Sequence, residues 1–124
     1  MAKIALDFDG TVCVHRYPSI GKDIGSVPVL KELISNGHLL ILNTMRSGQE
    51  LEDAVEWFKD NEIPLYGINS TPGQSTWTSS PKVYAHLYID DAALGIPLVR
   101  NGRERPYVNW SEVREMLIEE GYIK

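Results

Sequence analysis

Four short apolar runs, separated by longer and more polar segments, constrain the fold of this chain more than any other feature. They are residues 3–8 (KIALDF), 38–43 (HLLILN), 64–68 (PLYGI) and 86–90 (HLYID). Near-continuous apolar runs of this length indicate strands buried in a sheet. Strands that alternate with helices imply a parallel sheet with helices on both faces. We therefore expect an α/β fold: a three-layer, doubly wound domain of Rossmann-like type with a mainly parallel sheet.

Three further segments have the apolar spacing of amphipathic helices, with residues three and four apart falling on one face. The first is expected to have Ser26 as its cap and to stop near Gly37. The second follows Ser47 and Glu50, whose spacing is that of a capping box. The third is expected to have Asn109 as its cap. These helices would supply the crossovers of the parallel sheet.

The remaining segments are rich in turn-forming residues. Residues 10–26 hold several Gly, Pro and Ser residues without a clear period, and they are expected to form a flap-like excursion. We expect a surface loop over residues 69–80, a short helix over 81–86, and an edge strand or hairpin over 96–108. No linker divides the chain, so residues 1–124 are expected to form one domain.

Composition limits the class of protein. A chain of 124 residues with 43% apolar residues has enough material for one real core. Its net charge of −5 gives no extended nucleic-acid footprint. Cys13 is the only cysteine, so no internal disulfide can form and a reducing compartment is the simple inference. Without a membrane-length apolar run or a signal-peptide pattern, the protein is expected to be cytoplasmic, with no membrane partner.

Polar side chains gather where the predicted strands end, and ligands of such sheets bind outside those ends. The side chains expected there are Asp7, Asp9, Thr44, Asp90 and Asp91, with Arg46 and Lys82 close by. Converging carboxylates repel one another unless a cation compensates, and their oxygen atoms suit a hard cation such as Mg²⁺. A hydroxyl and an ammonium group beside that cation would make a site for a phosphoryl group.

Four segments, in their order along the chain, resemble the motifs of the haloacid dehalogenase (HAD) superfamily. LDFDGTV, residues 6–12, is similar to motif I, in which two aspartates follow an apolar strand. LILNT, residues 40–44, resembles motif II, an apolar strand that ends in Thr or Ser. Lys82 resembles the lysine of motif III, and LYIDD, residues 87–91, resembles the acidic motif IV. Four ordered matches are far more specific than one acidic pair.

The resemblance implies a separate chemical role for each aspartate of the first motif. Asp7 would be the nucleophile, attacking phosphorus to give an aspartyl-phosphate. Asp9 would be the general acid/base, which protonates the leaving oxygen and then activates the hydrolytic water. Gly10 would allow the tight turn that brings both side chains to one phosphate.

The resemblance also implies how metal and phosphate are held. Mg²⁺ would take its ligands from the Asp7 carboxylate, the Asp9 backbone carbonyl, Asp90 and, directly or through water, Asp91. Thr44 and Lys82 would bind the phosphoryl oxygens, and Lys82 would also offset the carboxylate charge.

Several neighbouring side chains have two interpretations. Arg46 could contact a phosphate or a leaving group, or it could pair with an acid. In the flap, His15, Arg16 and Tyr17 could select the substrate or form a solvated turn. Trp77 could stack on a base or a sugar, or it could anchor its loop.

The gaps between the motifs are too short for the cap domain that the superfamily usually adds, so the resemblance implies a capless member with an open site. Such members often take large substrates or borrow a lid from another subunit, which would make a homo-oligomer. The segments HRYP and MRSGQELEDAVEWF are similar to small phosphatase-like proteins of bacteria and phages. The expected function is Mg²⁺-dependent hydrolysis of a phosphomonoester: a small molecule, a nucleotide or a nucleic-acid end.

Two other functions compete with this hypothesis. Phospho-receiver signalling domains also form an aspartyl-phosphate, but their phosphorylated aspartate ends a middle strand. Here the corresponding segment GINS, residues 67–70, has no acid. The other alternative is a non-catalytic binding or regulatory protein that keeps the fold, and the complete motif set argues against it.

Overall fold

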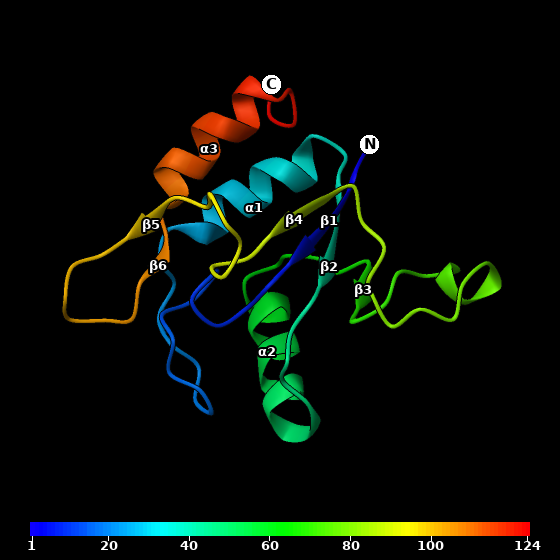
Figure 1. The fold of residues 1–124 in the computed structure, drawn as a ribbon, viewed down its shortest axis with the longest axis horizontal. Helices are drawn as coiled ribbons and strands as arrows, with labels where there is room; N and C mark the ends of the chain where they lie inside the picture. Colours follow the sequence, from blue (N-terminus) through cyan, green and yellow to red (C-terminus); the bar gives the residue numbers. More distant parts are fainter.

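The computed structural model describes residues 1–124 and contains a four-stranded parallel sheet at its centre (Figure 1). Its strands are β1 (Lys3–Leu6), β2 (Leu39–Leu42), β3 (Gly67–Ile68) and β4 (Leu87–Ile89). Their order in the sheet is β3-β2-β1-β4, and all three neighbouring pairs are parallel. Every predicted strand is present, although each is shorter than its apolar run. The α/β fold of Rossmann-like type is confirmed.

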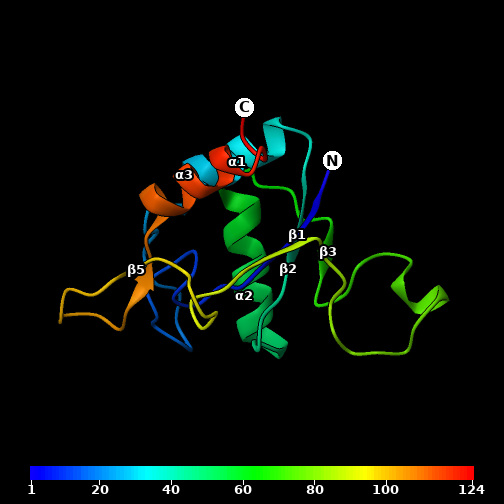
Figure 2. The ribbon, with the colours of Figure 1, turned by 45° about the horizontal axis from the view of Figure 1, so that its top comes forward.

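Three α-helices contribute to the main core on one face of the sheet. They are α1 (Ser26–Ser35), α2 (Gly48–Asp60) and α3 (Trp110–Glu119), and α3 lies beside α1 (Figures 1 and 2). The side chains of Ile4 and Leu6 alternate with Ala5 along β1, so they point to this face and join the main cluster. None of the helices combines the length and the apolar character needed to cross a bilayer.

The second face of the sheet is covered without an α-helix, unlike the expected arrangement with helices on both faces. Ala5 and Ile41 point to this face and form a small cluster with Val83, which lies in the connection from β3 to β4. The short helix expected over residues 81–86 is not formed, and the only helical turn of this connection is the 3₁₀ helix Gln74–Thr76.

Strand order explains why the helices share one face. The steps from β1 to β2 and from β2 to β3 run in the same direction, so right-handed crossovers put α1 and α2 on the same side. The step from β3 to β4 returns across the whole sheet, and its chain contacts the opposite face through Val83. This connection is rich in Ser, Thr, Pro and Gly, which favour turns over helix.

A two-stranded antiparallel hairpin follows the sheet, as the sequence predicted for this region. Its strands are β5 (Leu98–Val99) and β6 (Tyr107–Val108), and they form a separate small sheet. The Val108 amide donates a 3.0 Å hydrogen bond to the Gly10 carbonyl, which fixes the hairpin beside the end of β1. The hairpin lies on the opposite side of the molecule from the connection between β3 and β4 (Figures 1 and 2).

The helix ends agree only partly with the predicted caps. Asn109 caps α3 through its side chain, which accepts a hydrogen bond from the Glu112 amide. Ser47 occupies the cap position of α2 but makes no capping hydrogen bond, so the predicted capping box is wrong. Ser26 is the first residue of α1, and its amide and hydroxyl both donate to the Asp23 carboxylate. The side chain of Asp23, in the segment before α1, therefore supplies the capping acceptor that was expected from Ser26.

Candidate active site

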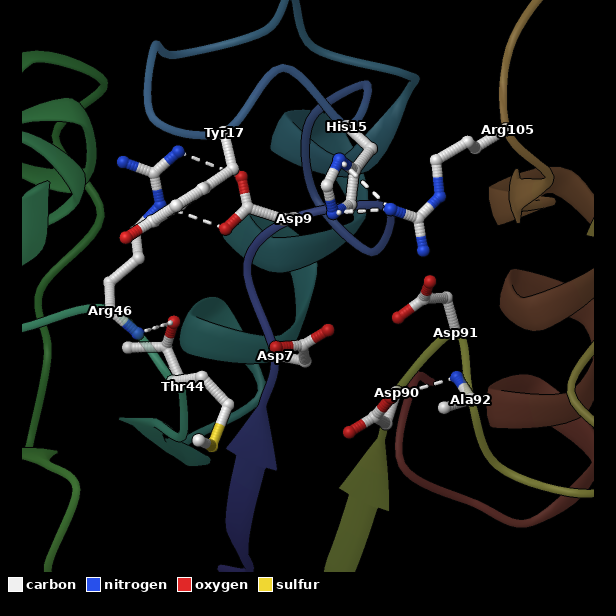
Figure 3. Close-up of a pocket in the computed structure, with 11 residues that line it drawn as sticks. Asp7, Asp9, His15, Tyr17, Thr44, Arg46, Asp90, Asp91, Ala92 and Arg105 are labelled. Carbon is white, nitrogen blue, oxygen red and sulfur yellow. Dashed lines mark hydrogen bonds and ion pairs between the residues drawn. The ribbon is translucent and has the colours of Figure 1, made fainter.

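The candidate site is a cavity of about 480 Å³ beyond the carboxyl ends of β1, β2 and β4 (Figure 3). The four predicted metal-site aspartates, Thr44 and Arg46 all line it, whereas Lys82 does not. This position follows from the parallel sheet, because the ends of neighbouring parallel strands open to the same edge. The structure thus brings the predicted residues that follow β1, β2 and β4 into one cavity.

Three carboxylates form a tight group within the cavity. Asp7 follows β1 while Asp90 and Asp91 follow β4, and carboxylate oxygens from all three lie within 4.8 Å of one another. All three side chains are half-buried. Carboxylate oxygens at this spacing are suitable ligands for a hard divalent cation. The group could therefore hold a metal ion.

Thr11 connects two members of this group. Its hydroxyl lies 3.1 Å from Asp7 Oδ2 and 3.3 Å from Asp91 Oδ1, and it accepts a 3.0 Å hydrogen bond from the Asp91 amide. A hydroxyl has one proton to donate, so the two carboxylates share that donor. Thr11 is completely buried, and it orients the group without occupying the cavity. We infer that Thr11 keeps Asp7 and Asp91 close despite their charge.

Gly10 is required by the close approach of the two chain segments. Its φ is +79°, which favours glycine, as the predicted tight turn requires. A Cβ atom at this position would lie only 2.5 Å from Asp91 Oδ2. Any larger residue would push Asp91 away from Asp7.

The environment of Asp7 disfavours its ionised form. Burial makes the largest contribution, followed by a hydrogen-bonding interaction with Asp91 and the negative charge of Asp90. Together they raise the pKa of Asp7 from 3.8 to about 8. A bound cation would act in the opposite direction, because it stabilises the carboxylate form.

Asp9 has very different surroundings, although it is only two residues away. Its carboxylate does not belong to the group around Asp7. Instead it accepts two hydrogen bonds of 2.8 Å from Arg46, one from Nε and one from Nη2 (Figure 3). A bidentate pair of this kind is among the stronger charge-assisted interactions in proteins. The charge of the Asp9 carboxylate is thus balanced by Arg46, and the Asp9 side chain is 14% exposed.

All five N–H groups of Arg46 are engaged within the protein. Besides Asp9, the guanidinium donates to the backbone carbonyls of Pro18, Ser19 and Glu50. The side chain is only 1% exposed. Of the two interpretations of Arg46, pairing with an acid is the one this structure forms, and the acid is Asp9. No donor is free for a substrate in this conformation.

Thr44 lies in the cavity on the side of β2, and its backbone is well fixed. Its hydroxyl oxygen accepts a 3.1 Å hydrogen bond from the Arg46 amide, while its own amide donates to Asn69 Oδ1 at 2.8 Å. The hydroxyl proton of Thr44 therefore points to no protein acceptor and can be donated to a ligand oxygen.

Lys82 is the predicted site residue that the structure does not bring to the cavity. It is exposed, and its Nζ lies 5.4 Å from the ring centre of Tyr88. Tyr88 is paired with Ala5 in the sheet register, so it points to the second face of the sheet. The expected helix over 81–86 is not formed, and the phosphate-binding role of Lys82 stays a prediction.

Two loops form the remaining wall of the cavity. His15 and Tyr17 come from the segment between β1 and α1, and Arg105 comes from the loop between β5 and β6. Arg105 Nη1 lies 3.0 Å from Nε2 of His15. Next to this contact, Arg16 makes two hydrogen bonds to the Glu104 carboxylate. Tyr17 and His15 thus lie at the cavity, whereas Arg16 joins the two loops.

Trp77 and Cys13 lie away from the cavity. Trp77 is 63% exposed and packs edge-on against Tyr84 in the connection from β3 to β4. Cys13 is completely buried. Burial above all, and then the charges of Asp23 and Asp9, raise the pKa of its thiol to about 12, so the thiol is unreactive.

Sequence reasoning missed three residues of the site. Thr11 stands within the DGTV segment and Asn69 directly follows β3, so their positions in the sequence could have indicated them. Arg105 carried none, because it lies in an irregular loop that reaches the cavity only through the tertiary fold.

Fold and site together define a single-domain α/β protein with a group of three aspartates at its strand ends that could hold a metal ion. No protein-family model matches the chain, and no curated protein matches it. A solved structure does match: the conserved protein coded by a locus of Bacteroides thetaiotaomicron. The two chains are 37% identical with a TM-score of 0.80, over 96% of this chain and 91% of that one. The chain belongs to the same family as this conserved protein.

Proposed function

We propose that this protein is a Mg²⁺-dependent phosphomonoester hydrolase of the haloacid dehalogenase superfamily that works through an aspartyl-phosphate on Asp7. The observation that carries the proposal is the composition of one cavity. It combines an acidic group able to bind a metal, a free hydroxyl donor on Thr44 and a second aspartate in a different environment.

The residues present fit a magnesium ion. Asp7, Asp90 and Asp91 would hold it, since they offer three converging carboxylates without a cationic side chain hydrogen-bonded to any of them. When bound, the ion would neutralise charge on the phosphoryl oxygens and on the carboxylates. Asp9 would contribute its backbone carbonyl, as the resemblance implies, because its side chain is occupied by Arg46.

Asp7 would supply the nucleophilic oxygen. The Thr11 hydroxyl lies at one oxygen of its carboxylate and fixes the orientation of the group. In the first step the new bond from Asp7 oxygen to phosphorus forms as the bond from phosphorus to the leaving oxygen breaks. Thr44 would donate its free hydroxyl proton in a hydrogen bond to a phosphoryl oxygen, which stabilises the charge that develops there.

Asp9 would act as the general acid in the first step and as the general base in the second. A protonated Asp9 gives its proton to the leaving oxygen, and the resulting carboxylate then takes a proton from the water that attacks phosphorus. Water attack releases inorganic phosphate and restores Asp7. The two hydrogen bonds from Arg46 fix the orientation of the Asp9 carboxylate beside the cavity.

A comparison of matched variants tests the proposal. Phosphate release is measured from p-nitrophenyl phosphate, sugar phosphates, nucleotides and 3′- and 5′-phosphorylated oligonucleotides, with Mg²⁺ and with EDTA. We expect metal-dependent turnover that falls at least about 10³-fold in Asp7→Asn. Asp60→Asn, an exposed acid at the end of α2, is the control and keeps full activity. Equal turnover of Asp7→Asn and the wild type would refute the proposal.

A non-catalytic binding protein is the second candidate, and the pair of Asp9 with Arg46 favours it. That pair occupies the carboxylate of the expected general acid, and Lys82 lies outside the cavity. If the wild type releases no phosphate from the whole panel yet binds Mg²⁺ and phosphate, this second candidate replaces the first.

A further inference from the structure

Arg105 is a cationic side chain of the cavity that the proposed reaction does not use. It lines the cavity, it is exposed, and it forms no ion pair with any carboxylate of the protein. Its one polar partner is the His15 ring, which Nη1 contacts. A guanidinium has five N–H donors in a planar fork, so most of its hydrogen-bonding capacity is free.

The balance of charges in the cavity indicates which side chain can bind an anionic ligand. Four aspartates line the cavity, and the only two cationic side chains among its lining residues are Arg46 and Arg105. Arg46 is fully engaged with Asp9 and three carbonyls. Arg105 is therefore the lining cation that can meet an anionic ligand, and it lies outside the acidic group rather than being paired with it.

The position of Arg105 is fixed by contacts on both sides of it in the sequence. Glu104 binds Arg16 through two hydrogen bonds, and Arg105 itself contacts His15, so consecutive residues of the two loops face each other. Behind this loop, Val108 is tied to the Gly10 carbonyl. Ordering a long side chain before the ligand arrives lowers the entropic cost of binding.

We propose that Arg105, supported by His15, binds a second phosphate-type anion on the substrate, next to the phosphomonoester that reacts at Asp7. This inference rests on the proposed function. Figure 3 shows Thr44 on one side of Asp7 and Arg105 on the other, beyond Asp91. With a phosphoryl group bound between Asp7 and Thr44, Arg105 would therefore face the rest of the substrate.

The chemistry of the two side chains specifies the class of ligand. A guanidinium fork matches two oxygens of a phosphate or phosphodiester, and charge-assisted pairs of this kind are strong. The substrate would thus be a bisphosphate or a phosphorylated end whose neighbouring group is a phosphodiester. Both sources present the same phosphate oxygens to Arg105, and the test separates them.

Turnover of matched substrates is the first test. We compare kcat/KM for adenosine 3′,5′-bisphosphate, a 3′-phosphorylated dinucleotide and p-nitrophenyl phosphate. Arg105→Ala should lower the ratio of either phosphate-bearing substrate to p-nitrophenyl phosphate about tenfold or more. Arg105→Lys should restore part of it, because charge is kept and the fork is lost. Arg103→Ala, on the same exposed loop but outside the cavity, should leave the ratio unchanged.

Binding to an inactive variant keeps the test independent of catalysis. In Asp7→Asn with Mg²⁺, titration calorimetry compares adenosine 3′,5′-bisphosphate with adenosine 3′-phosphate. Addition of Arg105→Ala should weaken the bisphosphate about tenfold and the monophosphate much less.

The two proposals fail in different ways. If the wild type hydrolyses no ester but Arg105→Ala still weakens the bisphosphate selectively, only the proposed function is overturned. If turnover is metal-dependent but Arg105→Ala leaves both the ratio and the selective binding unchanged, only this inference is overturned. If Arg105→Ala lowers the kcat/KM ratio for the dinucleotide alone, the second anion is a phosphodiester. If it lowers the ratio for the bisphosphate alone, the second anion belongs to a small molecule.

Discussion

Asp7 and Asp9 are two residues apart, yet the two sides of the cavity treat them in opposite ways. Asp7 is grouped with Asp90 and Asp91, without a cationic side chain bound to any of them, and its pKa is raised to about 8. Asp9 is held by a bidentate ion pair with the buried Arg46. Different surroundings allow two identical side chains to have different chemical roles. The acidic side could hold a cation, whereas the carboxylate of the other side already has its cationic partner in Arg46.

Removal of Arg46 breaks its ion pair with Asp9, and this change should have the largest effect on the stability of the folded protein. Arg46→Ala leaves Asp9 and three backbone carbonyls without their donor, in a place where the arginine side chain is 1% exposed. We expect a loss of about 3–5 kcal/mol in the free energy of unfolding, measured by urea denaturation. A double-mutant cycle with Asp9→Asn isolates the pair, and a coupling energy near zero would contradict this account.

Addition of Mg²⁺ tests whether the group of Asp7, Asp90 and Asp91 binds a cation. At a concentration about 100 times its dissociation constant, the ion should stabilise the folded protein by about 2.7 kcal/mol, seen as a rise in Tm that EDTA reverses. Asp90→Asn should remove most of this rise, since it removes one of the three grouped carboxylates. Glu56→Gln, on the exposed face of α2, is the matched control. An equal rise in all three proteins would show that the ion binds elsewhere.

Neutralisation of Asp7 should change the stability of the folded protein with a sign opposite to that of Arg46→Ala. With the pKa raised from 3.8 to about 8, folded Asp7 keeps its proton where the unfolded chain has lost it. The free energy of unfolding of metal-free protein should therefore fall as pH rises from about 4 to about 8. Asp7→Asn removes this loss, so near pH 8 it should be more stable than the wild type, with an upper bound of about 1.4 kcal/mol for each unit by which the pKa is raised.

Thermal unfolding in EDTA across that pH range measures the difference. It should shrink toward pH 4, where both states of the wild type approach protonation. A constant difference at all pH values would mean that Asp7 is not the titrating group.

The sequence allowed the sheet and its strand-end residues to be predicted, because both depend on local patterns. Apolar runs mark the strands, and a parallel sheet necessarily brings Asp7, Thr44 and Asp90 to one edge. The partner of Arg46 and the site position of Arg105 depend on contacts between residues far apart in sequence. No local pattern encodes such contacts. The second face, which is covered without an α-helix, and the position of Lys82 also differ from expectation.

Arg46 also joins Asp9 to the segment between β1 and α1. The same guanidinium that binds Asp9 holds the carbonyls of Pro18 and Ser19, at the exposed tip of the segment between β1 and α1. Loss of the Asp9 carboxylate would remove one set of these bonds, and a displacement of the tip would break the other. The segment at the mouth of the cavity is therefore tied to Asp9 through a single side chain, and Arg46→Ala would release both.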